Sequence, residues 1–209
     1  MSTFPPALGA VAARARLLYA MLHGSFNTSQ QCLSAAAAVV LAAAEDRIPA
    51  VFLAGSMSWR VVAPERDDGT SPTHYSYIWS PHEPRSSANY AAHSRATSGS
   101  LTELMASVDR LPQLPEVHCW AVLLHEETPY IVDLTTESLK PLATRLGLTW
   151  SMPDPPTTFI GIPDGSSIVY HHEQEATTIC VRIVVARLMR ASPTLGSLFL
   201  NHLRQRPSK

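Results

Sequence analysis

The stretch VHCWAVLL at residues 117–124 decides the fold, together with YIVDL at residues 130–134. Both are apolar and rich in strand-forming residues, and the ETP sequence at residues 127–129 predicts a turn between them. Two strands joined by so short a connection are expected to be antiparallel neighbours. Asp133 should then lie within about three residues of His118 across the ladder.

The alternation of side chains along a strand places His118 and Trp120 on one face and Cys119 on the other. We therefore expect Cys119 to be inert packing that need not lie near Cys32. A metal pair made by His118 and Cys119 is disfavoured for the same reason, because adjacent strand residues point to opposite faces. No metal site is predicted.

Cys32 opens an alanine-rich apolar run, CLSAAAAVVLAAA at residues 32–44, after the polar sequence NTSQQ at residues 27–31. The high helix propensity of alanine and the polar residues before it predict a capped helix from about residue 30 to 44. Cys32 then lies in the first helical turn. Free backbone N–H groups and the helix dipole stabilise a thiolate at that position.

The order of the predicted elements is helices first, then strands, then helices again, which indicates a single α+β domain over residues 1–209. Residues 64–99 are rich in turn formers, and we expect them to form an irregular flap over a substrate cleft. A hairpin is expected at Gly55 and Ser56. The other predicted helices are residues 8–22, 101–111, 139–146, 177–191 and 195–203, and the other predicted strands are residues 50–54, 58–63, 75–79, 159–162 and 167–170.

Composition and charge disfavour several classes of partner. The formal net charge is -1, so nothing favours nucleic acid or an anionic membrane surface. The three cysteines are widely spaced and odd in number, which indicates a reducing, cytoplasmic compartment without a disulfide framework. The apolar run at residues 32–44 is shorter than the about 20 residues that cross a bilayer, and residues 1–8 show no signal-peptide pattern. No glycine-rich phosphate loop occurs, and no cofactor is expected.

Cys32, His118 and Asp133 have the residue types of a nucleophile, a base and an orienting acid. An imidazole activates the thiol for attack on a carbonyl carbon, and a carboxylate holds the imidazole in place. The oxyanion would be held by the backbone N–H of Cys32 with a polar side chain from Gln31 or Asn27. This chemistry predicts a cysteine-dependent hydrolase or acyltransferase acting on a small-molecule or peptide amide.

Two tryptophans are candidates for substrate binding. Trp120 shares the predicted face of His118, so we expect it to form both core and substrate wall. Trp59 is expected to line the core or the pocket.

Three motifs resemble the transglutaminase-like branch of the papain-like cysteine enzymes. IPAVFLAG at residues 48–55 is similar to the strand that follows the catalytic helix in that family. HCW at residues 118–120 resembles its H-x-W strand, and YIVDLT at residues 130–135 resembles its aspartate strand. The resemblance covers well under half of the chain. It implies a papain-like fold, with the cysteine helix packed on an antiparallel β-sheet, and it assigns the same three residues as the catalytic triad.

Two positions depart from that family. The arginine that often follows I-P-A is Val51 here, and Leu33 stands where an aromatic residue usually follows the nucleophile. The substrate class therefore does not carry over. Papain-like proteins include peptidases, amidases, transglutaminases and arylamine acetyltransferases, and some members have lost activity.

Each residue of the triad also has a purely structural interpretation. Cys32 could be a small buried residue, His118 a hydrogen-bonded core histidine, and Asp133 a cap for the following turn. The protein would then be a non-catalytic binding protein that keeps the papain-like fold. A third alternative is an acyltransferase that uses coenzyme A. Fast alkylation of Cys32 at about pH 6 distinguishes an enzyme from a binding protein, because an ordinary thiol is protonated there.

Overall fold

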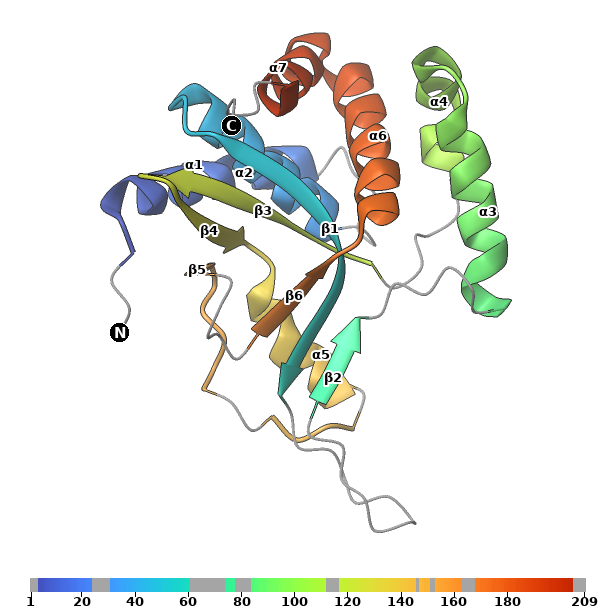
Figure 1. Ribbon diagram of the computed structural model, residues 1–209. Coiled ribbons are helices and arrows are strands. Elements are labelled where there is room, and N and C mark those ends of the chain that lie inside the picture. Colours follow the sequence, from blue (N-terminus) through green and yellow to red (C-terminus); the bar gives the residue numbers. More distant parts are fainter. Residues whose placement is uncertain are drawn as a thin grey trace.

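Six antiparallel strands form one sheet, and helices pack against it (Figure 1). The computed structural model describes residues 4–23, 31–60, 74–77, 84–111, 117–145, 147–150, 153–162 and 168–204. The α-helices are α1 (Pro6–His23), α2 (Gln31–Glu45), α3 (Pro84–Ser98), α4 (Leu101–Ser107), α5 (Leu139–Arg145), α6 (Gln174–Ala191) and α7 (Pro193–Arg204), with 3-10 turns η2 (Val108–Arg110) and η3 (Thr136–Ser138). The strands are β1 (Ala50–Arg60), β2 (His74–Tyr77), β3 (His118–His125), β4 (Thr128–Asp133), β5 (Phe159–Gly161) and β6 (Ile168–His172). This is the predicted α+β class.

The sheet has the order β2-β1-β3-β4-β5, and β6 also pairs with β1. The strand β1 runs through Gly55 and Ser56 without a break, so the predicted hairpin at these residues is wrong. Gly55 pairs with His118 of β3 and with His172 of β6, and a Cβ there would lie 2.1 Å from the carbonyl oxygen of His171. The glycine therefore marks a close approach of two backbones and not a turn.

The hairpin of β3 and β4 is present as expected, but its turn does not lie at the predicted residues 127–129, because Thr128 and Pro129 already pair with β3 as part of β4. Residues 126–127 join the strands with φ angles of 49° and 65°, the left-handed conformation of a two-residue hairpin turn. One step beyond the pair Ala121–Val132, the register brings Asp133 opposite Trp120, two positions from His118. The expected proximity of the acid to the histidine along the ladder is confirmed.

The helix α2 is the centre of the hydrophobic core. Its residues from Leu33 to Ala43 are all buried. It contacts α1, the strands β1, β3 and β4, and α7. The short alanine side chains allow these elements to approach α2 closely, and they favour the helix itself. The helix that carries Cys32 therefore packs on an antiparallel sheet.

The segment of residues 64–99 is not irregular where the structure describes it, because it contains β2 and α3. Residues 64–73 and 78–83 lie outside the described part. On α3, His93 and Thr97 are buried four residues apart, so the hidden face of this helix is partly polar. Hydrophobic periodicity cannot detect such a helix. It contacts α4 and α6 (Figure 1), and its role as a flap stays a prediction.

The other predicted elements lie within a few residues of the observed ones. The predicted helix 101–111 is divided into α4 and η2, and Ser100 begins it with a reciprocal capping box to Glu103. The predicted strands near residues 75, 159 and 167 correspond to β2, β5 and β6. Over the described residues, no helix combines the length and apolar character needed to cross a bilayer.

Candidate active site

The three predicted residues come together where the beginning of α2 meets the beginning of β3. Cys32 is the second residue of α2 and is partly exposed. Its Sγ lies 3.8 Å from the carbonyl oxygen of Val117, and its neighbours include His118 and Cys119, both of which form hydrogen bonds with it. The thiol is thus held at the first helical turn, as the sequence predicts.

His118, the first residue of β3, connects the thiol to the carboxylate. Its Nε2 lies 2.7 Å from Oδ2 of Asp133, and both side chains are buried. Since Asp133 occupies Nε2, Nδ1 is the nitrogen left for the hydrogen bond with Cys32. The Trp120 ring stacks on the imidazole with 6.2 Å between ring centroids and 17° between planes. The imidazole therefore has a fixed orientation between its two partners.

Asp133 accepts hydrogen bonds at both of its oxygens. Oδ1 accepts from the backbone N–H and the hydroxyl of Thr135 at 2.8 and 2.7 Å. Oδ2 accepts from the Tyr170 hydroxyl at 3.0 Å and faces His118. The structural interpretation of Asp133 as a turn cap thus holds for Oδ1, while Oδ2 is available to orient the imidazole.

The charges of the three groups reinforce one another. Hydrogen bonding by Cys119 and by His118 holds the pKa of Cys32 well below its ordinary value, against the opposing effect of burial. Burial lowers the pKa of His118, but the Asp133 carboxylate and the Cys32 sulfur together raise it to about 10. Burial likewise raises the pKa of Asp133, yet His118 and Thr135 keep it below its usual value. These shifts favour the ionised pair, a thiolate beside an imidazolium.

Cys119 is not remote from Cys32, so the expectation that it is uninvolved packing is wrong. Both its side chain and its backbone form hydrogen bonds with the Cys32 sulfur. Burial and a hydrogen bond with Cys180 raise the pKa of Cys119 well above the ordinary value. Cys119 therefore stays a thiol that can donate to the Cys32 thiolate. Face alternation fails here because Cys32 lies at the end of β3, beside Val117, where both faces are within reach.

Tyr170 is the functional neighbour that the sequence does not reveal. It lies on β6, its hydroxyl donates to Asp133, and its ring packs against His118 at 6.0 Å and Trp120 at 5.0 Å between centroids. Phe159 continues this group of rings at 6.1 Å from Tyr170. Only the pairing of β6 with β1 brings Tyr170 to the site, and no local pattern encodes that pairing.

Some of the other predicted site residues lie beside the triad and others do not. Gln31 is the exposed first residue of α2, next to Cys32, and Asn27 lies outside the described residues. Trp120 is 2% exposed and forms a wall behind the imidazole, whereas Trp59 is 0% exposed in a second cluster with Met57 and Leu139. Their roles in oxyanion and substrate binding stay predictions. Within the described ranges, no group of three or more histidine, cysteine, aspartate or glutamate side chains is arranged to hold a metal ion.

Comparison of the chain with protein-family models, with curated proteins and with solved structures found no match.

Proposed function

We propose that the protein is a cysteine-dependent hydrolase or acyltransferase that acts through Cys32, His118 and Asp133. The observation that carries the proposal is the position of the His118 imidazole. It lies 2.7 Å from the Asp133 carboxylate and forms a hydrogen bond with the Cys32 sulfur. A covalent acyl-transfer mechanism needs a nucleophile, a base and an orienting acid, each hydrogen-bonded to the next.

The reaction begins from the thiolate–imidazolium pair. The Cys32 sulfur attacks an amide, ester or thioester carbonyl, and the carbonyl oxygen becomes an oxyanion. The backbone N–H of Cys32, with Gln31 or Asn27, stabilises that charge. His118 gives its proton to the leaving group as the carbon–leaving-group bond breaks, which leaves an acyl-enzyme.

The second half of the reaction returns the enzyme to its starting state. His118, now neutral, takes a proton from a water molecule or an amine as that group attacks the acyl carbon. The bond between sulfur and carbon breaks, and the thiolate forms again beside the imidazolium. Asp133 keeps its charge throughout and holds the imidazole in position, and the acceptor decides whether the outcome is hydrolysis or acyl transfer.

The arrangement of elements supports a papain-like assignment. A helix carries the cysteine, it packs on an antiparallel sheet, and the histidine and the acid lie on adjacent strands of that sheet. Within this proposal the substrate is a small-molecule or peptide amide. Trp120, which stacks on His118, limits the space behind the imidazole.

The test is the pH dependence of iodoacetamide labelling, resolved by mass spectrometry, on wild type, His118→Ala and a matched control. His125→Ala is the control, because His125 lies at the other end of β3. We expect Cys32 to label fast at about pH 6 in the wild type and the control, and slowly in His118→Ala. Cys119 and Cys180 are buried thiols and serve as internal references.

Labelling of Cys32 no faster than that of Cys119 or Cys180 would overturn the proposal, as would an unaffected His118→Ala variant. In that case the protein is better described as a non-catalytic binding protein with the same architecture. If selective labelling is found, a screen of amide, ester and thioester substrates follows. Cys32→Ser is then the inactive reference.

A further inference from the structure

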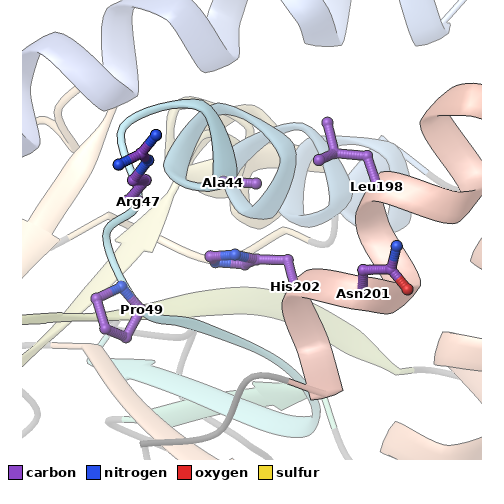
Figure 2. A pocket seen from close by; sticks show the side chains of 6 residues that line it. All are labelled: Ala44, Arg47, Pro49, Leu198, Asn201 and His202. Atoms are coloured by element: carbon purple, nitrogen blue, oxygen red, sulfur yellow. The ribbon is translucent and has the colours of Figure 1, made fainter.

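A cavity lies between the C-terminal end of α2 and the helix α7, far from the triad. Its volume is about 380 Å³, within the range of roughly 300–1,000 Å³ that is typical of small-molecule sites. From Cys32 to the cavity residue Ala44, α2 rises by about 18 Å along its axis. The described side chains that line the cavity are Ala44, Arg47, Pro49, Leu198, Asn201 and His202 (Figure 2).

His202 contributes a buried nitrogen to this cavity. The side chain is 8% exposed, and its Nε2 has no hydrogen-bond partner among the described residues. Its ring also forms a hydrogen bond with the backbone of Ile48. Burial lowers the pKa of His202 and so favours the neutral imidazole, in which one ring nitrogen accepts a hydrogen bond. A buried acceptor of this kind favours a ligand with an N–H or O–H group.

Arg47 contributes a positive charge that has no counter-ion among the described residues. The neighbouring carboxylates of Glu45 and Asp46 both pair with Arg14, at 3.4 and 2.7 Å. Arg47 has a φ of 57°, a left-handed conformation that costs energy for a residue with a Cβ. This conformation ends α2, because the backbone N–H of Ile48 bonds the carbonyl of Ala43 one turn earlier. The exposed Arg47 side chain, which lines the cavity, has no carboxylate partner in the described part of the chain.

The remaining lining residues limit the size and chemistry of a ligand. Ala44, Pro49 and Leu198 provide apolar walls, and the exposed Asn201 adds an amide that can donate and accept (Figure 2). The last carbonyls of α2 are already bonded, since Ala44 and Ala43 accept from the backbone N–H groups of Arg47 and Ile48. The negative end of the helix dipole disfavours an anion here. An acidic ligand therefore depends on Arg47.

We propose that this cavity is a binding site for a small carboxylate that also carries a hydroxyl or amino donor, the chemistry of a hydroxy acid or an amino acid. The Arg47 guanidinium binds the carboxylate with two parallel hydrogen bonds. Nε2 of His202 accepts from the donor group, and Asn201 bonds whatever polar group remains. The site does not involve Cys32, so its test is independent of the test of the enzymatic proposal.

The test is NMR titration with L-lactate, following the side-chain ¹⁵N resonances of His202. We expect a saturable shift of Nε2 as lactate binds. Acetate, which lacks the donor, and propane-1,2-diol, which lacks the carboxylate, should bind at least about tenfold more weakly. No saturable shift with lactate at millimolar concentration, or equal binding of acetate and lactate, would overturn the proposal.

Two arginine variants locate the carboxylate. Arg47→Gln should weaken lactate binding by about tenfold or more, because it removes a charged donor pair. Arg145→Gln makes the same change in charge at an exposed position on α5 and should leave binding unchanged. Unaltered binding in Arg47→Gln, or an equal loss in both variants, would count against the site. Chemical denaturation of each variant checks that its fold is intact.

Discussion

Tyr170 and His118 share one carboxylate oxygen, Oδ2 of Asp133, which lies 3.0 Å from the tyrosine hydroxyl and 2.7 Å from the histidine Nε2. The two donors come from different strands, Tyr170 from β6 and His118 from β3, and both strands pair with β1. They fix the oxygen from two directions. The acid is therefore held by the fold as a whole and not by its own strand alone.

Replacement of Tyr170 by phenylalanine should destabilise the protein by about 1–3 kcal/mol at neutral pH, because a buried carboxylate loses a donor. The measurement is chemical denaturation. Tyr130→Phe is the matched control, since its hydroxyl forms no hydrogen bond with the described residues. If both variants are equally stable, the hydroxyl of Tyr170 does not support the carboxylate.

Asp133→Asn should lower the pKa of His118 from about 10. The carboxylate that contributes most to raising the pKa is lost, while burial still lowers it and only Cys32 still raises it, so we expect a value well below about 10. The imidazolium partner of the Cys32 thiolate is then less stable, and labelling at about pH 6 becomes slower. Histidine NMR and the pH profile of Cys32 alkylation measure these effects. Asp154→Asn, an exposed change, is the control, and an unchanged His118 pKa in Asp133→Asn would contradict the assigned ion pair.

Cys32→Ala should change how stability depends on pH. Between about pH 6.5 and 8.5, the folded wild type holds one proton on the two groups, on the imidazolium of the ion pair. The unfolded chain also holds one, on the Cys32 thiol beside a neutral imidazole. The pair therefore does not make the free energy of unfolding depend on pH in this range. In Cys32→Ala, Asp133 still keeps the pKa of His118 raised, so the folded state alone holds the proton.

The stability that His118 contributes in this variant is fully present below about pH 6.5 and is lost as pH rises toward the folded pKa. The slope approaches about 1.4 kcal/mol per pH unit at most. Denaturation curves of wild type and Cys32→Ala over this pH range give the difference between their free energies of unfolding. The contributions of all other titrating groups are the same in both proteins and drop out of this difference. A constant difference between pH 6.5 and 8.5 would mean that the ion pair is not the resting state.

Gly55→Ala should destabilise the protein by about 1–3 kcal/mol or more, because a methyl group would lie 2.1 Å from the His171 carbonyl oxygen and 2.8 Å from the Glu173 nitrogen. The displacement of β6 should also move Tyr170 and slow the labelling of Cys32. Gly147→Ala is the contrasting variant. It has a φ of 73° but open space around it, so it should cost about 1 kcal/mol without any effect on Cys32.

The parts of the site that lie in local motifs could be predicted from the sequence. Cys32 follows a polar sequence and lies in the first turn of an alanine-rich helix, and a short turn between the two apolar strands brings Asp133 close to His118. Each of these relationships depends on residues close together in the chain. The predicted triad is accordingly brought together as expected.

The parts that depend on distant pairing could not be predicted. Tyr170 reaches Asp133 only because β6 pairs with β1, and Gly55 looks like a turn residue until that pairing is known. The alternation of a strand does not say where the beginning of α2 lies, so it cannot place Cys119 beside Cys32. Hydrophobic periodicity does not detect the helix α3, because His93 and Thr97 occupy its buried face.

The groups that donate to Asp133 lie at distant positions in the sequence, which sets the order in which they are synthesised. A chain is synthesised from its N-terminal end. The thiol of Cys32 exists before β3 and β4 supply the imidazole and the carboxylate, and β6 supplies Tyr170 later still. A ribosome-bound chain that ends before β6 thus lacks the Tyr170 hydroxyl, so the hydrogen bonds around the buried Asp133 carboxylate are completed only when β6 pairs with β1.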